Sequence, residues 1–237
     1  MLRNDYIIFG SCNTQDYCVG IFGDQLANAP ERAIEVVSVP GKNGDVILDD
    51  GRYNNIIVSY KAYIVDEYNV NIRGLRNALM AQRGYQKLED TVNPEEYRMG
   101  YFLPFEIDEV GVLRAGEFTL TFNCKPQRFL KSGNQPIVIN SASSIFNQYE
   151  ERALPLIRAY GTGSFTIGDV TVQITSANSY TDIDCETMEA YKDTMATNCN
   201  GNIVLTNGEF PYLDPGTNSI SMSGITQLDI YPRWWIL

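Results

Sequence analysis

The sequence predicts a mainly β protein of the α+β class, with two domains and one helix in the first of them. Short runs of apolar and β-branched residues recur along most of the 237 residues, many of them alternating with polar residues, which is typical of strands. Gly, Pro, Asn and Asp separate these runs and indicate turns. The segment 70–83 differs, because its apolar residues follow the three- and four-residue spacing of a helix.

The first expected elements are strands at 34–39, 46–48 and 56–65. Between the first two lies Pro-Gly-Lys-Asn-Gly-Asp at 40–45, a composition that fixes turns and tolerates positive φ. We therefore expect a strand, an ordered loop and a return strand.

The helix expected at 70–83 has an apolar face and a basic face. Its apolar positions are Ile72, Leu75 and Leu79, and its basic positions are Arg73, Arg76 and Arg83. Gly84 follows as the residue that ends the helix. The arginines either solvate one face and favour the negative end of the helix dipole, or they face a partner.

A further strand is expected at 116–124, where Phe118, Leu120 and Phe122 alternate with polar residues. Cys124 continues the alternation, so we expect its thiol to be buried. Pro126 ends the strand because proline cannot donate to a ladder.

The composition changes at Ser132-Gly133-Asn134, which predicts domains at 1–133 and 134–237. The first has 14 basic and 18 acidic residues (14 − 18 = −4), and the second has 4 and 11 (4 − 11 = −7). The second lacks a helical period, and its short strand-like runs are separated by Gly, Asn, Asp or Pro. This pattern predicts an all-β sandwich of about 100 residues.

Composition excludes several classes of function. The chain has no histidine, which removes Ser-His-Asp and Cys-His catalysis and His-ligated zinc. Its net charge of −11 disfavours stable binding to nucleic acid. The five cysteines are irregularly spaced without a C-x-x-C pair, so we expect reduced thiols and no metal or other cofactor.

The sequence has no apolar run long enough to cross a bilayer and no apolar stretch typical of a signal peptide at its start. We therefore expect a soluble protein made in the cytoplasm, with no membrane partner.

Paired carboxylates are the remaining route to catalysis without histidine. The candidates are Asp49-Asp50, Asp66-Glu67, Glu95-Glu96, Glu106-Ile107-Asp108-Glu109, Glu150-Glu151 and Asp182-Ile183-Asp184. Adjacent acids on a strand point to opposite faces, so we expect hydrated side chains and no catalytic site. Asp182 and Asp184 share a face if they lie on a strand, but that spacing alone is weak evidence for a cation site.

The last residues include Arg233, Trp234 and Trp235. The two tryptophans are the only ones in the sequence, and no arginine follows Arg233. Such residues are typical of binding hot spots and of aromatic platforms for sugars. The favoured alternative is that one indole is buried in the core and the other lies at a domain or subunit contact.

Several segments, in order along nearly the whole chain, resemble the distal tail (Dit-type, phage tail component) proteins of long non-contractile phage tails. These segments are Pro40-Gly41-Lys42-Asn43-Gly44-Asp45, Gly51-Arg52-Tyr53-Asn54-Asn55, residues 84–90, Tyr97-Arg98, residues 118–129, Leu154-Pro155-Leu156-Ile157, Pro215-Gly216-Thr217-Asn218 and Pro232-Arg233-Trp234-Trp235.

The resemblance implies an N-terminal β-barrel-like or β-sandwich domain with one helix, which forms a homohexameric ring, and a C-terminal galectin-like β-sandwich. In the virion tail tip the ring would join the tail tube protein to the tail-associated tip protein. Its outer domains would attach receptor-binding or baseplate proteins. DNA would only pass through its channel, and six copies with 6 × −11 = −66 formal charges would repel it.

The residues expected at oligomer or docking contacts are Gly41, Asn43, Gly44, Arg52, Tyr53, Arg233, Trp234 and Trp235. The loop from 40 to 51 would supply one surface of the ring. Galectins use a histidine among their sugar contacts and this chain has none, so we expect a docking module. The main alternative is a carbohydrate-binding adhesion module, and a carboxylate glycosidase is the third.

Overall fold

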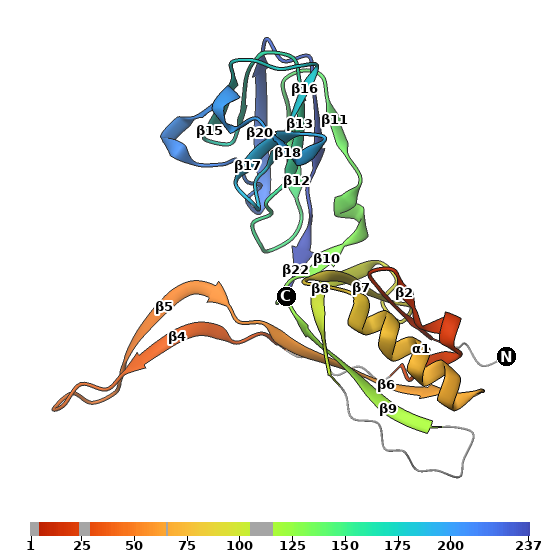
Figure 1. Ribbon diagram of the computed structural model, residues 1–237. Coiled ribbons are helices and arrows are strands. Elements are labelled where there is room, and N and C mark those ends of the chain that lie inside the picture. The colour runs from red at the N-terminus through yellow and green to blue at the C-terminus, as the bar shows by residue number, and fades with distance from the viewer. Residues whose placement is uncertain (1–4, 24–28, 65, 105–115) are drawn as a thin grey trace. The chain divides into compact units, whose positions relative to one another are not determined.

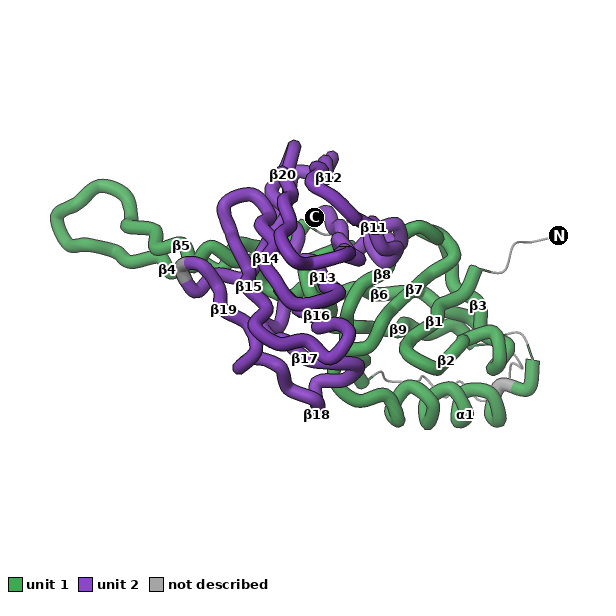
Figure 2. Tube along the Cα trace, turned by 90° about the horizontal axis from the view of Figure 1, so that it is seen from above, with its two compact units in different colours: residues 1–128, 237 green, residues 129–236 purple. Residues whose placement is uncertain are grey.

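The computed structural model describes residues 5–23, 29–64, 66–104 and 116–237. The chain divides into two compact units, residues 1–128 with 237, and residues 129–236 (Figure 2). The described chain is mainly β with one α-helix, which confirms the predicted fold class. The boundary expected at Gly133 lies inside the second unit, in the 3-10 turn η2 (Lys131–Asn134). Among the described residues, no helix has the length and apolar character needed to span a membrane.

The first unit contains a curled antiparallel sheet with the strand order β2-β1-β7-β8-β9-β6-β3 (Figure 1). Two strands separate β1 from β9, yet the rings of Phe9 and Phe122 lie 4.9 Å apart. A flat sheet would hold these strands about 14 Å apart, so the sheet curls around its core. The strands are β1 (Ile7–Phe9), β2 (Cys12–Asn13), β3 (Val19–Ile21), β6 (Ile56–Ile64), β7 (Gln86–Asp90), β8 (Glu96–Leu103) and β9 (Gly116–Cys124), with the 3-10 turn η1 (Thr14–Tyr17) between β2 and β3.

The alternation predicted at 116–124 is confirmed in β9. Phe118, Leu120 and Phe122 are buried, and Cys124 has no exposed surface. Burial raises the pKa of the Cys124 thiol to about 12. All five cysteines are free thiols.

The helix α1 (Tyr68–Ala81) packs its apolar face into the core of this unit. Leu75 and Leu79 are at most 1% exposed and Ile72 is 8% exposed, which confirms the predicted apolar face. The helix ends earlier than the expected Gly84, because Gln82 is already extended and its backbone N–H donates to Leu79 O. The Gln82 side chain also donates to Ser11 Oγ at 2.9 Å, which holds this end against the β1–β2 turn. Gly84 has a φ of +66° in the turn that leads to β7.

The strands β4 (Arg32–Val37) and β5 (Val46–Tyr53) form a separate two-stranded hairpin, which extends away from the curled sheet (Figure 1). The return strand is longer than the expected 46–48. Gly51, at a φ of +71°, accommodates an irregular register between the strands, and its N–H donates to Asp49 Oδ1 at 2.8 Å. The turn-like Asp49-Asp50-Gly51 is therefore part of β5.

The second unit is an antiparallel sandwich, as the galectin-like prediction requires. Its six-stranded sheet has the order β11-β21-β13-β16-β17-β18 and its five-stranded sheet the order β12-β20-β14-β15-β19. Residues from both sheets, such as Ile157, Phe165, Val172 and Leu228, are at most 1% exposed and fill the space between them. The strands are β11 (Ile137–Ile139), β12 (Ser143–Asn147), β13 (Leu156–Tyr160), β14 (Gly163–Ile167), β15 (Val170–Ile174), β16 (Tyr180–Asp184), β17 (Glu189–Lys192), β18 (Thr194–Asn198), β19 (Ile203–Leu205), β20 (Gly216–Ser223) and β21 (Gln227–Tyr231). Short elements complete the chain: β10 (Arg128–Leu130), β22 (Trp235–Ile236), η3 (Asn200–Asn202) and η4 (Thr206–Gly208).

Candidate functional site

The β4–β5 hairpin exposes apolar side chains on both of its faces. Val36 and Ile47 are direct partners in the register, so they share one face, and they are 54% and 62% exposed. Leu48 and Val37 lie on the other face and are 51% and 37% exposed. A two-stranded hairpin is marginally stable in water on its own, so these faces are suited to contact with another molecule.

Five of the predicted docking residues lie on this hairpin. Gly41 and Gly44 have φ values of +82° and +81° in the exposed turn beyond β4, and Asn43 between them is exposed. Arg52 is exposed and lies 3.5 Å from Asp50. Tyr53 is half-buried because the Arg32 guanidinium stacks 5.0 Å from its ring centre. The structure therefore brings these five residues to one projecting element. Their role as contacts stays a prediction.

The other three predicted docking residues lie in the C-terminal segment of the second unit, and two of them already have internal partners. Arg233 makes two hydrogen bonds to the Asp184 carboxylate, at 2.7 and 2.8 Å. Trp234 is 8% exposed and packs in the sandwich core beside Tyr149. Trp235 is half-buried, so one indole is in the core and the other remains accessible.

The Asp184–Arg233 pair holds the end of the chain on the six-stranded sheet. Burial alone would raise the pKa of the Asp184 carboxyl, but Arg233 and the N–H groups of Glu186 and Thr187 lower this pKa below its usual range. Burial alone would lower the pKa of the Arg233 guanidinium, but the hydrogen bonds and the charge of Asp184 raise the pKa of Arg233 above its ordinary value. The Asp184 carboxylate is 4% exposed and the Arg233 side chain 22% exposed, so the ion pair is largely buried, and the guanidinium also lies 3.6 Å from the Glu186 carboxylate.

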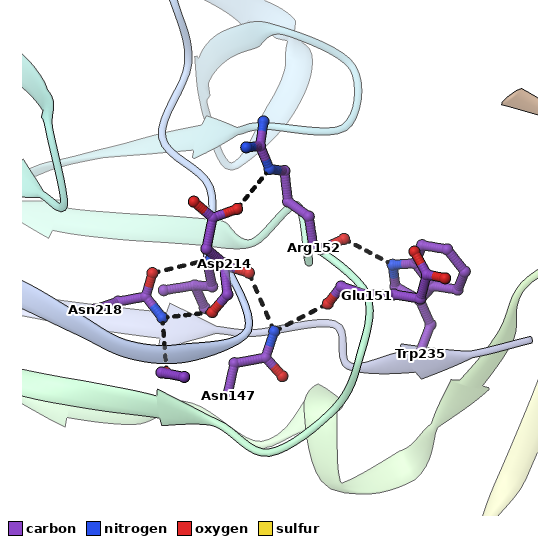
Figure 3. Close-up of polar contacts among 8 residues, drawn as sticks. Asn147, Glu151, Arg152, Asp214, Asn218 and Trp235 are labelled. Carbon is purple, nitrogen blue, oxygen red and sulfur yellow. Dashed lines mark hydrogen bonds and ion pairs between the residues drawn. The ribbon is translucent and has the colours of Figure 1, made fainter. Parts of the chain in front are cut away.

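Around Trp235, a polar network fixes the loops at one end of the sandwich (Figure 3). The indole N–H donates to Arg152 O at 3.0 Å, and the Arg152 side chain pairs with Asp214 at 2.7 Å. Asn147 donates to Glu151 O and Leu213 O from the buried side of the same loops. These bonds hold Trp235 and Arg152 at a fixed place on the surface of the unit, as a docking surface requires.

The polar face of the six-stranded sheet, opposite the core, carries several paired groups. Arg158 donates to both oxygens of Asp182, at 2.7 and 2.9 Å, and the hydrogen bond to Asp182 raises the pKa of Arg158 above its ordinary value. The ring of Tyr180 is flanked by two cations, Arg158 at 4.3 Å and Lys192 at 5.3 Å from its centre. A sugar ring stacks on a free aromatic face, and these contacts occupy the face of Tyr180.

Several of the candidate carboxylates are paired with arginines in the part of the chain that the structure describes. Asp182 and Asp184 share a face, but each is paired with a different arginine. Asp49 pairs with Arg32, and Glu96 with Arg128. No cluster of three potential metal ligands occurs among the described residues. The candidates at 106–109 lie outside the described residues.

Sequence reasoning missed the exposed apolar residues of the hairpin, such as Val36 and Ile47, as candidate contacts. A signal was present, because apolar residues at consecutive positions of both strands cannot all face one core. It also missed the pairing of Asp184 with Arg233, which joins residues 49 positions apart.

Comparison with known proteins finds this fold in phage tail structures. No protein-family model and no curated protein matches the sequence. The crystal structure of the Dit protein of phage SPP1, described as a paradigm of the hub adsorption apparatus in phages that infect Gram-positive bacteria, matches with a TM-score of 0.69 and 12% identity. That match covers 95% of this chain and 97% of the other.

Chains from two structures of the phage P2 baseplate in its activated conformation, with Ca and with Sr, also match. Both have a TM-score of 0.53, with 10% and 9% identity, and both matches cover 97% of this chain and at least 97% of the other. At these identities the likeness establishes the fold, and it extends over nearly the full length of both chains.

Proposed function

We propose that this chain is a distal tail protein, a structural component of a phage tail tip that forms a homohexameric ring. The observation that carries the proposal is the full-length likeness of the fold to the SPP1 Dit protein, over 95% of this chain and 97% of that one. The ring joins the tail tube to the tail-associated tip protein and anchors receptor-binding or baseplate proteins. The protein is made in the host cytoplasm and acts in the virion tail tip.

In this proposal the two domains have different roles. The first domain, 1–133, forms the ring, and the second, 134–237, points outward as a docking module. A closed ring needs two different surfaces on each subunit, and the exposed β4–β5 hairpin is suited to be one of them. The accessible Trp235 beside Arg152 is suited to contact a second protein, because Trp and Arg are enriched in binding hot spots.

The proposed role involves no catalysis and no cofactor. The chain has no histidine, and the carboxylates of Asp182, Asp184, Asp49 and Glu96 are each engaged with an arginine. The proposed channel lets DNA pass without binding, because six copies carry 6 × −11 = −66 formal charges.

The test is the mass of the purified full-length protein, measured by light scattering, with negative-stain images of the same sample. A hexamer has a mass of 6 × 26.6 kDa, about 160 kDa, and should appear as rings with a central opening. A chain that stays at 26.6 kDa at every concentration, and that forms no ring when mixed with its tail tube protein, would refute the proposal. Binding to cell-wall glycans by the isolated protein would favour the adhesion alternative.

A further inference from the structure

The exposed face of α1 is basic, and its charges have no partners within the described chain. Arg73, Arg76 and Arg83 are all exposed, and none of them has an ion-pair partner among the described residues. The helix and the two residues after it, residues 68–83, contain these three bases and no acid (3 − 0 = +3). A local charge of +3 on a chain of −11 is a distinct feature of the surface.

The same helix face also carries exposed apolar side chains. Val70 is 68% exposed and Met80 is 60% exposed. Positions 70, 73, 77 and 80 follow one another at three- and four-residue spacing and therefore lie along one side of the helix, opposite Leu75 and Leu79. A face that combines unpaired arginines with large exposed apolar side chains is typical of a protein contact.

The β4–β5 hairpin has the complementary properties. Residues 31–53 contain five acids and three bases (3 − 5 = −2). Two of those bases are already paired, Arg32 with Asp49 and Arg52 with Asp50. The charged residues that remain are three acids, Glu31, Glu35 and Asp45, and one base, Lys42. Glu35 and Leu48 are direct partners in the register, so one face of the hairpin presents an unpaired acid next to an exposed apolar residue.

The two elements also match in size. The 14 residues of α1 extend about 21 Å at about 1.5 Å per residue. The six residues of β4 extend about 20 Å at about 3.3 Å per residue.

We infer that the β4–β5 hairpin of one copy of this chain docks on the exposed face of α1 of a second copy. Glu35 and the other unpaired acids of the hairpin face the arginines of the helix, and Val37 and Leu48, which lie on the same hairpin face as Glu35, pack against the exposed apolar residues of the helix. Because the two surfaces differ, the contact repeats from copy to copy and can close a ring. This inference rests on the proposed function and adds to it the two surfaces that form the ring.

The inference is tested by charge reversal on each surface and on both together. Glu35→Lys with Asp45→Lys, and separately Arg73→Glu with Arg76→Glu, should each convert the hexamer to species near 26.6 kDa in light scattering at micromolar concentration. In a mixture of the two variants, every hairpin–helix contact between unlike copies joins opposite charges and every contact between like copies is repulsive, so the mixture should form hexamers in which the two variants alternate. The chain with all four substitutions should return to the wild-type mass, because it restores opposite charges at every contact.

Asp169→Lys with Glu209→Lys is the matched control. It makes the same change of charge at two exposed residues of the second unit and should leave the hexamer intact. Circular dichroism should show that all variants are folded, since every substituted residue is exposed.

The outcomes separate the inference from the proposed function. If wild-type protein is hexameric and the two surface variants remain hexameric, the inference is wrong and the ring stands. The inference is also wrong if both surface variants dissociate but the chain with all four substitutions does not form hexamers. The dissociation would then not depend on attraction between the hairpin and the helix. If wild-type protein forms no ring under any condition, the proposed function itself fails.

Discussion

Removing the Arg233 side chain should destabilise the second unit strongly, although this residue lies close to the end of the chain. In the Arg233→Ala variant, the Asp184 carboxylate, which is 4% exposed in the wild-type protein, loses two hydrogen bonds of 2.7 and 2.8 Å. Arg233 has a φ of +54°, but Ala and Arg both carry a Cβ, so the cost of this backbone conformation is similar in both proteins. The change in stability therefore reports the lost ion pair.

The magnitude follows from what remains around Asp184. Breaking a buried pair by removing one partner costs about 3–5 kcal/mol. Two backbone donors remain, the N–H groups of Glu186 at 3.0 Å and Thr187 at 3.2 Å, and Arg233 is itself 22% exposed, so we expect about 2–4 kcal/mol. The second unit has 236 − 129 + 1 = 108 residues, and for a unit of this size the loss lowers Tm by about 8–16 °C.

Differential scanning calorimetry of the full chain measures this loss in the transition of the second unit. The matched control is Arg152→Ala, which breaks an exposed pair whose side chains are 54% and 48% exposed. Such pairs contribute about 1 kcal/mol or less. If Arg233→Ala lowers Tm no more than Arg152→Ala does, Asp184 is not a buried charge that depends on Arg233, and the reasoning is wrong.

Three further predictions follow from the described contacts. The stability contributed by the Asp184–Arg233 pair depends on pH, because the pKa of Asp184 is lowered in the folded state. It should be complete above the ordinary Asp pKa of about 3.9 and be lost as the pH falls below it, so the Tm difference between wild type and Arg233→Ala should shrink in scans at pH 3. Gly133→Ala should cost about 1–3 kcal/mol in denaturant unfolding, because its Cβ would lie 2.3 Å from the backbone N of Trp234; an unchanged unfolding midpoint would contradict this. Burial raises the pKa of Cys12 to about 11, that of Cys124 to about 12 and that of Cys185 higher still. A thiol reagent at pH 8 should therefore label Cys18 and Cys199 in the native protein, and the other three only after unfolding.

Sequence reasoning predicts the elements whose signal is local. The alternation of Phe118, Leu120 and Phe122 is sufficient for β9, because a half-buried strand needs only a period of two. The helix at α1 follows from its apolar spacing in the same way. In contrast, the turn residues Asp49-Asp50-Gly51 lie within β5, since the pairing with β4 overrides their local preference.

The candidate contacts depend on information that is not local. The sequence places Arg233, Trp234 and Trp235 together, but it does not show that Arg233 is bound by Asp184 and that Trp234 is buried. The exposure of Val36 and Ile47 likewise depends on the hairpin lying outside the curled sheet. A strand with the same residues inside a sandwich would have an ordinary buried face.

The two units differ in whether their basic side chains have partners, and we therefore expect them to respond differently to salt. After residue 134, each of the four basic side chains has a partner in its own unit. These partners are Asp214 for Arg152, Asp182 for Arg158, Asn178 O and the Tyr180 ring for Lys192, and Asp184 for Arg233.

In the first unit, Arg73 and Arg76 of α1, Arg83 just after it, and the hairpin acids Glu31, Glu35 and Asp45 are instead exposed and have no ion-pair partner among the described residues. Exposed charges are screened within about 8–10 Å at physiological salt, whereas a buried pair is screened much less. High salt should therefore weaken contacts between copies at concentrations that leave the Asp184–Arg233 pair and the sandwich intact. If salt dissociated the rings only when it also unfolded the second unit, electrostatic attraction between copies could not be what holds the ring together.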